Sequence, residues 1–223
     1  MNPTRITTAL FSNQISDDEI PFFRGAMIRL SGDDTLFHNH NGDGFNYIYP
    51  LVQYKRIKGC GAVIGINQGG ELLSCLLEKR GEFLLQIGNQ EKEMKIAMLH
   101  SDTITITCDF SFEYTYSIGR WLPLNSENYR VYQQKESLVE RISMLEKILV
   151  GNILSFAKGV GIYFEHPVVC HFLQLESTGL IRYKDVELMS FSGKFRCNVR
   201  LPEGIGLGKL ASMNRGVIKY VNG

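Results

Sequence analysis

Hydrophobic positions in the first half of the chain switch between the spacing of strands and the spacing of helices. Residues 4–12 have the pattern of a strand, and Ser16 precedes acidic residues and an apolar run, which predicts a capped helix. Residues 69–81 carry leucines three and four positions apart and end on Gly81, which predicts a second helix. Strand-like runs occupy residues 46–58, 62–67, 82–88, 93–99 and 102–118. This order of elements is that of a ferredoxin-like domain, the split βαβ pattern.

The second half presents a similar order of elements, although no tandem sequence repeat is visible. Residues 119–129 have the composition of a linker, and residues 136–157 carry one apolar stripe, which predicts a long core helix. Strand-like runs follow at residues 166–176, 179–201 and 216–221. If residues 115–124 supply a first strand, this half is a second ferredoxin-like unit. We therefore predict an α+β protein of two tandem ferredoxin-like (RRM-like) domains with antiparallel sheets, at residues 1–118 and 119–223.

Composition narrows the class of protein. The chain has 223 residues, of which 44% are hydrophobic and 21% charged, as in ordinary globular proteins. The formal net charge is +1, so a nucleic-acid partner would have to be met by a local basic patch. Five dispersed cysteines favour reduced thiols and a cytoplasmic location. Neither a signal peptide nor a membrane-spanning apolar run is expected.

Two of the five histidines, His38 and His40, lie one residue apart in a turn rich in Asn, Gly and Asp. Because histidine titrates near neutral pH, the pair could be an acid and a base, half of a metal site, or two solvated surface residues. Nearby Asp33, Asp34 and Asp43 repeat no known metal-site spacing, so no metal is expected. The other histidines are expected in the core or on the surface: His100, His166 and His171.

A glycine-rich segment lies close to the carboxyl terminus. Gly204, Gly206 and Gly208 alternate before Lys209, and Arg215 precedes the last strand. Glycines allow backbone N–H groups to approach a phosphate, and a helix starting near Gly208 would direct its positive end to the same place. The spacing fits neither a Walker loop nor a dinucleotide fingerprint. A plain turn between two strands is the alternative interpretation.

Basic residues gather in two parts of this nearly neutral chain. Residues 194–219 contain a single acid, Glu203, and six basic residues: Lys194, Arg196, Arg200, Lys209, Arg215 and Lys219. A second cluster follows the histidine turn and is interleaved with tyrosines: Tyr47, Tyr49, Tyr54, Lys55, Arg56 and Lys58. Each cluster alone is typical of a solvated face. Together they favour a polyanion partner, since basic residues contact phosphates and aromatic rings stack on bases.

The glycine-rich segment and the order of elements resemble those of the CRISPR-associated repeat RNA endoribonucleases of the RAMP superfamily. The resemblance rests on "PEGIGLGKLASMNRGVIKY", residues 202–220, and on a histidine after the first helix, where His38 and His40 stand. It implies metal-independent cleavage of CRISPR precursor RNA within its repeats. The 2′-hydroxyl attacks the neighbouring phosphate and leaves a 2′,3′-cyclic phosphate and a 5′-hydroxyl.

This chemistry needs a base, an acid and positive charge near the phosphate. The resemblance implies that the base and acid are His38 and His40, assisted by Tyr47, Tyr49 or Lys55. The residues expected to bind RNA are Arg56, Lys58, Lys194, Arg196, Gly204, Gly206, Gly208, Lys209 and Arg215. Lys55 and Arg56 should point to opposite faces of their strand.

Two other functions stay open at this point. The chain could be a non-catalytic RNA-binding RAMP subunit of a CRISPR complex, or a ferredoxin-like module that binds a protein or a metabolite. For the favoured function we expect CRISPR repeat RNA as partner, other CRISPR-associated proteins as further partners, no cofactor and no membrane, and a monomer or homodimer.

Overall fold

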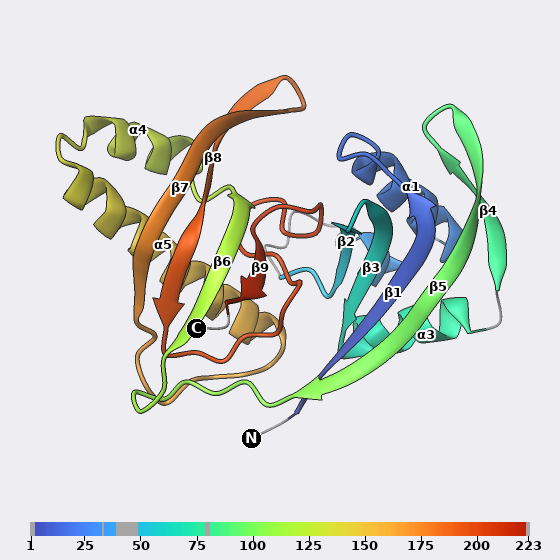
Figure 1. The fold of residues 1–223 in the computed structure, drawn as a ribbon, viewed down its shortest axis with the longest axis horizontal. Helices are drawn as coiled ribbons and strands as arrows, with labels where there is room; N and C mark the ends of the chain where they lie inside the picture. The colour runs from blue at the N-terminus through green and yellow to red at the C-terminus, as the bar shows by residue number, and fades with distance from the viewer. Residues whose placement is uncertain (1–2, 33, 39–48, 79–80, 222–223) are drawn as a thin grey trace. The chain divides into compact units, whose positions relative to one another are not determined.

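The computed structural model describes residues 3–32, 34–38, 49–78 and 81–221 (Figure 1). These residues fold into two units, each with its own antiparallel sheet. The first unit contains residues 1–105 and 212–214, and the second contains residues 106–211 and 215–223. Within the described residues, no helix is long and apolar enough to cross a membrane.

The first unit is a ferredoxin-like sheet with one extra strand. Its elements are β1 (Thr4–Gln14), α1 (Ile20–Leu30), α2 (Thr35–His38), β2 (Val52–Ile57), β3 (Cys60–Ile66), α3 (Gln68–Leu77), β4 (Glu82–Ile87) and β5 (Gln90–Ile104). The strand order is β2-β3-β1-β5-β4, and all pairings are antiparallel. Strand β5 takes the position of the last ferredoxin-like strand, and β4 extends the sheet as its hairpin partner.

Helices α1 and α3 pack on the sheet of this unit and close its core. The rings of Phe11, Phe23 and Tyr54 meet edge to face at centroid distances of 5.6 and 6.0 Å. Helix α3 lies very close to β3, because a Cβ on Gly65 would stand 2.6 Å from the Gly69 carbonyl oxygen. The glycines of the predicted helix therefore allow its first turn to touch the strand backbone.

The second unit is also ferredoxin-like, with strand order β7-β8-β6-β9. Its elements are β6 (Tyr114–Trp121), α4 (Ser126–Gln134), α5 (Leu138–Gly159), β7 (Cys170–Tyr183), β8 (Val186–Cys197) and β9 (Val217–Tyr220). The predicted first strand is present as β6. Between β8 and β9, where every residue is described, the chain forms turns instead of a second helix. Two tandem ferredoxin-like domains with antiparallel sheets are thus confirmed.

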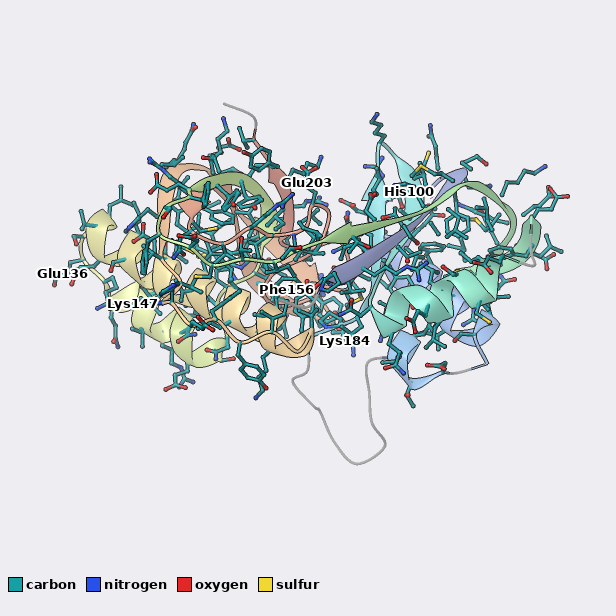
Figure 2. All side chains as sticks on the ribbon, turned by 90° about the horizontal axis from the view of Figure 1, so that it is seen from below. His100, Glu136, Lys147, Phe156, Lys184 and Glu203 are labelled. Atoms are coloured by element: carbon teal, nitrogen blue, oxygen red, sulfur yellow. The ribbon has the colours of Figure 1, made fainter. Side chains whose placement is uncertain are left out.

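Helix α5 has the apolar stripe that its sequence predicts. Ser137 accepts a hydrogen bond from the Glu140 amide and completes a capping box, which sets the start of the helix. Leu145, Leu149 and Ile153 are fully buried, whereas the opposite side is exposed and carries Lys147 (Figure 2). The first turn differs, since Leu138 is 66% exposed, but because the helix buries one face from Leu145 onward, tertiary packing supplies most of its stability.

The division between the units falls at residues 105 and 106, whereas the sequence pattern placed it after residue 118. The expected strand at residues 102–118 is two strands, because β5 ends at Ile104 and pairs with β1 and β4. Strand β6 pairs instead with β8 and β9 of the second unit. The two ends of this alternating segment therefore lie in different sheets, because they pair with different strands that are distant in the sequence.

Candidate functional site

His38 is the last residue of the short helix α2, and the stretch of sequence that contains His40 follows it. The amide of Leu36 donates to the Asp34 carboxylate at 2.9 Å, which supports the first turn of this helix. Phe37 is buried, and its carbonyl accepts from the Tyr54 hydroxyl at 3.3 Å. The helix ends at His38, whose backbone alone is described. His40 and Tyr47 lie outside the described residues.

Strand β2, which follows the histidine turn, carries a buried polar row on one face. Gln53 is fully buried, and its amide nitrogen donates to the Tyr49 hydroxyl at 2.8 Å and to the Pro50 carbonyl at 3.1 Å. Burial raises the pKa of Tyr49, so the phenol is neutral at physiological pH. Gln53 was not among the residues expected in the site. Its spacing of two from Lys55, which places both on one face of a strand, is the signal that could have found it.

Lys55 is the most perturbed cation in the described part of the chain. Its side chain is 1% exposed, and burial lowers its pKa from 10.5 to about 7. Desolvation disfavours the charged ammonium, which is the physical cause of the change. Near neutral pH this amine therefore exists in both protonation states, and it can accept a proton or present a positive charge. Both abilities suit a site that handles a phosphate.

The neighbours of Lys55 in the strand point to the other face. Tyr54 packs against Phe23 on the helix side of the sheet. Arg56 is exposed, and its Nε donates to the Ile15 carbonyl at 2.7 Å. Lys58 is exposed in the turn to β3 with a φ of 49°. The alternation expected for Lys55 and Arg56 is present, since one is buried and the other is exposed.

Two of the expected RNA-binding residues lie on β8. Lys194 and Arg196 share one face of the strand, because side chains two positions apart point the same way. Lys194 lies 3.9 Å from Glu176, and Arg196 forms a 2.8 Å ion pair with Glu113. All four side chains are roughly half-exposed, so water screens these pairs and an RNA phosphate can compete with the carboxylates.

The glycine-rich segment folds back along β9. The amide of Gly204 donates to the Ile218 carbonyl at 2.9 Å, and the amide of Leu207 donates to the Gly216 carbonyl at 2.9 Å. Gly206 bridges to Val217 in an antiparallel pair. The amides of Gly204 and Leu207 therefore bond to backbone carbonyls of residues 216–218. The alternative of a glycine-rich connection between strands describes this backbone better.

Gly208 has a packing role that the sequence did not reveal. It has a φ of +81°, and a Cβ there would stand 2.8 Å from Nε1 of Trp121 and 3.0 Å from Oδ1 of Asn152. The indole N–H of Trp121 donates to that Asn152 oxygen at 2.9 Å. No helix starts at Gly208, because Leu210 and Asn214 have φ values of 58° and 55°, which an α-helix does not accept.

The cations of this segment differ in their exposure. Lys209 is exposed, and its backbone is held by a hydrogen bond from its amide to the Leu122 carbonyl at 3.2 Å. Arg215 is half-buried. Three residues between them, Ser212–Asn214, belong to the first unit, where the Tyr54 amide donates to the Ser212 carbonyl at 2.7 Å. The segment therefore presents the Lys209 side chain to solvent from a fixed backbone.

Metal ligands do not cluster in the part of the chain that the structure describes. No group of three or more His, Cys, Asp or Glu side chains stands close enough there to hold a metal ion.

Both units match the domains of one known family. Residues 3–105 match the Cas6b N-terminal domain, and residues 107–221 match the Cas6b C-terminal domain. The two matches meet at the boundary between the units.

Solved structures and a curated relative give further comparisons. A crystal structure of Cas6b has a TM-score of 0.86 at 25% identity, and covers 99% of this chain and 100% of that chain. A crystal structure of the CRISPR RNA processing endoribonuclease Cas6b shares the fold, with a TM-score of 0.75 at 22% identity over 99% and 100% of the chains. An uncharacterised protein of Methanocaldococcus jannaschii is 33% identical over 101 residues, which are 45% of this chain and 67% of that protein.

Proposed function

Because the chain belongs to the Cas6b family, we propose that it is an endoribonuclease that cleaves CRISPR precursor RNA within its repeats. The observation that carries this proposal is the match of both units, in order and almost end to end, to the two Cas6b domains. The family match confirms the resemblance of the chain to CRISPR repeat RNA endoribonucleases of the RAMP superfamily.

The proposed reaction is attack by the 2′-hydroxyl on the adjacent phosphate, with departure of the 5′-oxygen. One of His38 and His40 removes the proton of the 2′-hydroxyl, and the other gives a proton to the leaving oxygen. Tyr47 lies in the same stretch of sequence and assists them. The 2′,3′-cyclic phosphate and the 5′-hydroxyl follow from this path, because the nucleophile belongs to the RNA itself.

Lys55 has two possible roles in this reaction, and pH decides between them. Below about pH 7 its ammonium form stabilises the additional negative charge on the phosphate oxygens in the transition state. Above that pH the neutral amine accepts a proton. Since the side chain is buried on β2, which follows the histidine turn in the chain, its positive charge acts in a medium that screens it weakly.

RNA binding is assigned to exposed or half-exposed cations in both units. They are Arg56, Lys58, Lys194, Arg196, Lys209 and Arg215. These side chains meet phosphates, and thus determine affinity and its dependence on salt more than sequence preference. Gly204, Gly206 and Gly208 act indirectly, because they set the path of the backbone that carries Lys209.

The decisive experiment is cleavage of a radiolabelled repeat RNA by the purified chain in excess chelator. We expect a single cut, a product that ends in a 2′,3′-cyclic phosphate, and no reaction when the 2′-hydroxyl at the cut is replaced by hydrogen. Salt-sensitive binding without any cleavage would instead identify a non-catalytic RNA-binding subunit. Absence of RNA binding at low salt would leave the ferredoxin-like module for a protein or metabolite as the function.

A further inference from the structure

Two buried cysteines face each other at one end of the β7–β8 hairpin. All five cysteines of the chain are free thiols. Cys170 begins β7 and Cys197 ends β8, and the two are direct partners in the antiparallel register. Cys170 is 4% exposed and Cys197 is 2% exposed. The proposed cleavage chemistry makes no use of this pair.

The hydrogen-bonding pattern shows which kind of cross-strand pair this is. The Asn198 amide donates to the Val169 carbonyl at 3.3 Å, so these two residues occupy a hydrogen-bonded position of the ladder. Positions alternate along antiparallel strands, so the adjacent pair of Cys170 and Cys197 is non-hydrogen-bonded. Such pairs have Cα atoms about 4.5 Å apart, within the range of about 4.4–6.8 Å that a disulfide requires.

The Cys197 thiol donates to the Val199 carbonyl at 3.3 Å. The neighbouring Cys170 thiol lowers the pKa of Cys197. The Cys197 thiol, together with burial, raises the pKa of Cys170. We therefore assign Cys197 as the sulfur that is oxidised first, and Cys170, its cross-strand partner in the register, as the sulfur that resolves it.

We propose that Cys170 and Cys197 form a peroxide-responsive dithiol site that converts reversibly into a cross-strand disulfide. The sulfur of Cys197 attacks one oxygen of hydrogen peroxide, the O–O bond breaks, and the departing hydroxide takes up a proton to become water. Cys197 is then a sulfenic acid. The sulfur of Cys170 attacks the Cys197 sulfur, the S–O bond breaks, and a second water leaves with the thiol proton. Two electrons pass from the thiols to the peroxide.

Hydrogen peroxide is a suitable oxidant because it is small enough to reach the buried thiols. Thiols with exposures of 4% and 2% exclude glutathione and other bulky disulfides, whereas peroxide is little larger than water. Cys108 is the competing partner, since it is partly exposed and its backbone is bridged to Val199, two residues from Cys197. However, the Cys108 thiol contacts the carbonyls of His166 and Pro167, both at 3.6 Å, and Cys108 itself is bridged to Val199, not to Cys197.

The test is disulfide mapping on the folded full chain. The protein is treated with a series of peroxide concentrations, remaining thiols are alkylated in denaturant, and peptides are identified by mass spectrometry. We expect a Cys170–Cys197 linked peptide, a loss of two hydrogens from the intact mass, and full recovery with dithiothreitol. The link should persist in Cys108→Ser and in Cys75→Ser, an exposed thiol on α3, and vanish in Cys170→Ala and in Cys197→Ala.

Three results would overturn the proposal. In the first, a peroxide dose that oxidises the exposed Cys75 leaves Cys170 and Cys197 reduced. In the second, Cys197 is found linked to Cys108, or as a sulfinic acid. In the third, the Cys170–Cys197 link forms only in urea, where the register of β7 and β8 no longer holds. Because the wild-type chain carries the main measurement, a variant that fails to fold does not decide the outcome.

Discussion

Replacing Lys55 by Met should make the protein more stable and less active. Methionine fills a similar volume and has no charge to desolvate. The Lys55 pKa falls from 10.5 in the unfolded chain to about 7 in the folded one, which corresponds to about 5 kcal/mol of unfavourable free energy when the ammonium is fully charged. Lys55→Met removes this unfavourable free energy at low pH. It also removes the charge or base that we propose for Lys55 at the phosphate.

The direction in which stability changes with pH follows from the lowered pKa of Lys55. Between pH 7 and 10.5 the unfolded chain keeps a proton on Lys55 that the folded chain has released. Stability of the wild type should therefore rise with pH in this window, by about 2–3 kcal/mol from about pH 6 to about pH 9, and should be lowest below pH 7. In Lys55→Met this contribution should be absent, so its gain over the wild type should be largest at the acid end.

Urea unfolding at a series of pH values measures the stability, and single-turnover cleavage of repeat RNA measures the activity. Lys147→Met, at an exposed position on α5, is the matched control and should change neither. We expect Lys55→Met to lower the cleavage rate by about 10² or more with little change in RNA affinity. If the free energy of unfolding of Lys55→Met rose with pH as steeply as that of the wild type, the buried charge of Lys55 would not be the cause. An unchanged cleavage rate would remove Lys55 from the site.

Three further predictions concern the other site residues. His38→Ala and His40→Ala should each lower the single-turnover rate by about 10²–10⁴ and remove one limb of a bell-shaped pH profile, whereas full activity in the double variant would end the histidine hypothesis. Lys209→Ala should weaken binding of all RNA sequences and reduce the salt slope by about one, measured by fluorescence anisotropy, and an unchanged slope would exclude a phosphate contact. Gly208→Ala should destabilise the second unit by about 1–3 kcal/mol in thermal unfolding, because the new Cβ meets Trp121 and the φ of +81° is strained, and a wild-type midpoint would contradict this.

Local patterns were sufficient for most of the elements and for the fold. The apolar stripe of α5 is determined within a few turns of chain, so the sequence predicts this helix directly. The order of strands and helices predicts both ferredoxin-like units, because short connections and right-handed crossovers leave few other topologies. Alternation along β2 likewise predicts that Lys55 and Arg56 face opposite sides.

Features that depend on long-range contacts needed the tertiary structure. The sequence cannot tell that the Lys55 face of β2 is covered, so it predicts the direction of the side chain but not its pKa near 7. It also cannot tell that the amides of Gly204 and Leu207 donate to the carbonyls of Ile218 and Gly216.

Distance along the chain explains which features could be predicted and which could not. Periodicity and capping act between residues a few positions apart and are visible in the sequence. Burial, strand register and proton affinity depend on residues far along the chain: Cys170 and Cys197 are unremarkable in the sequence, and only the β7–β8 register makes them partners. Trp121 and Asn152 meet beside Gly208 for the same reason, because a strand, a helix and a turn from distant parts of the chain converge there.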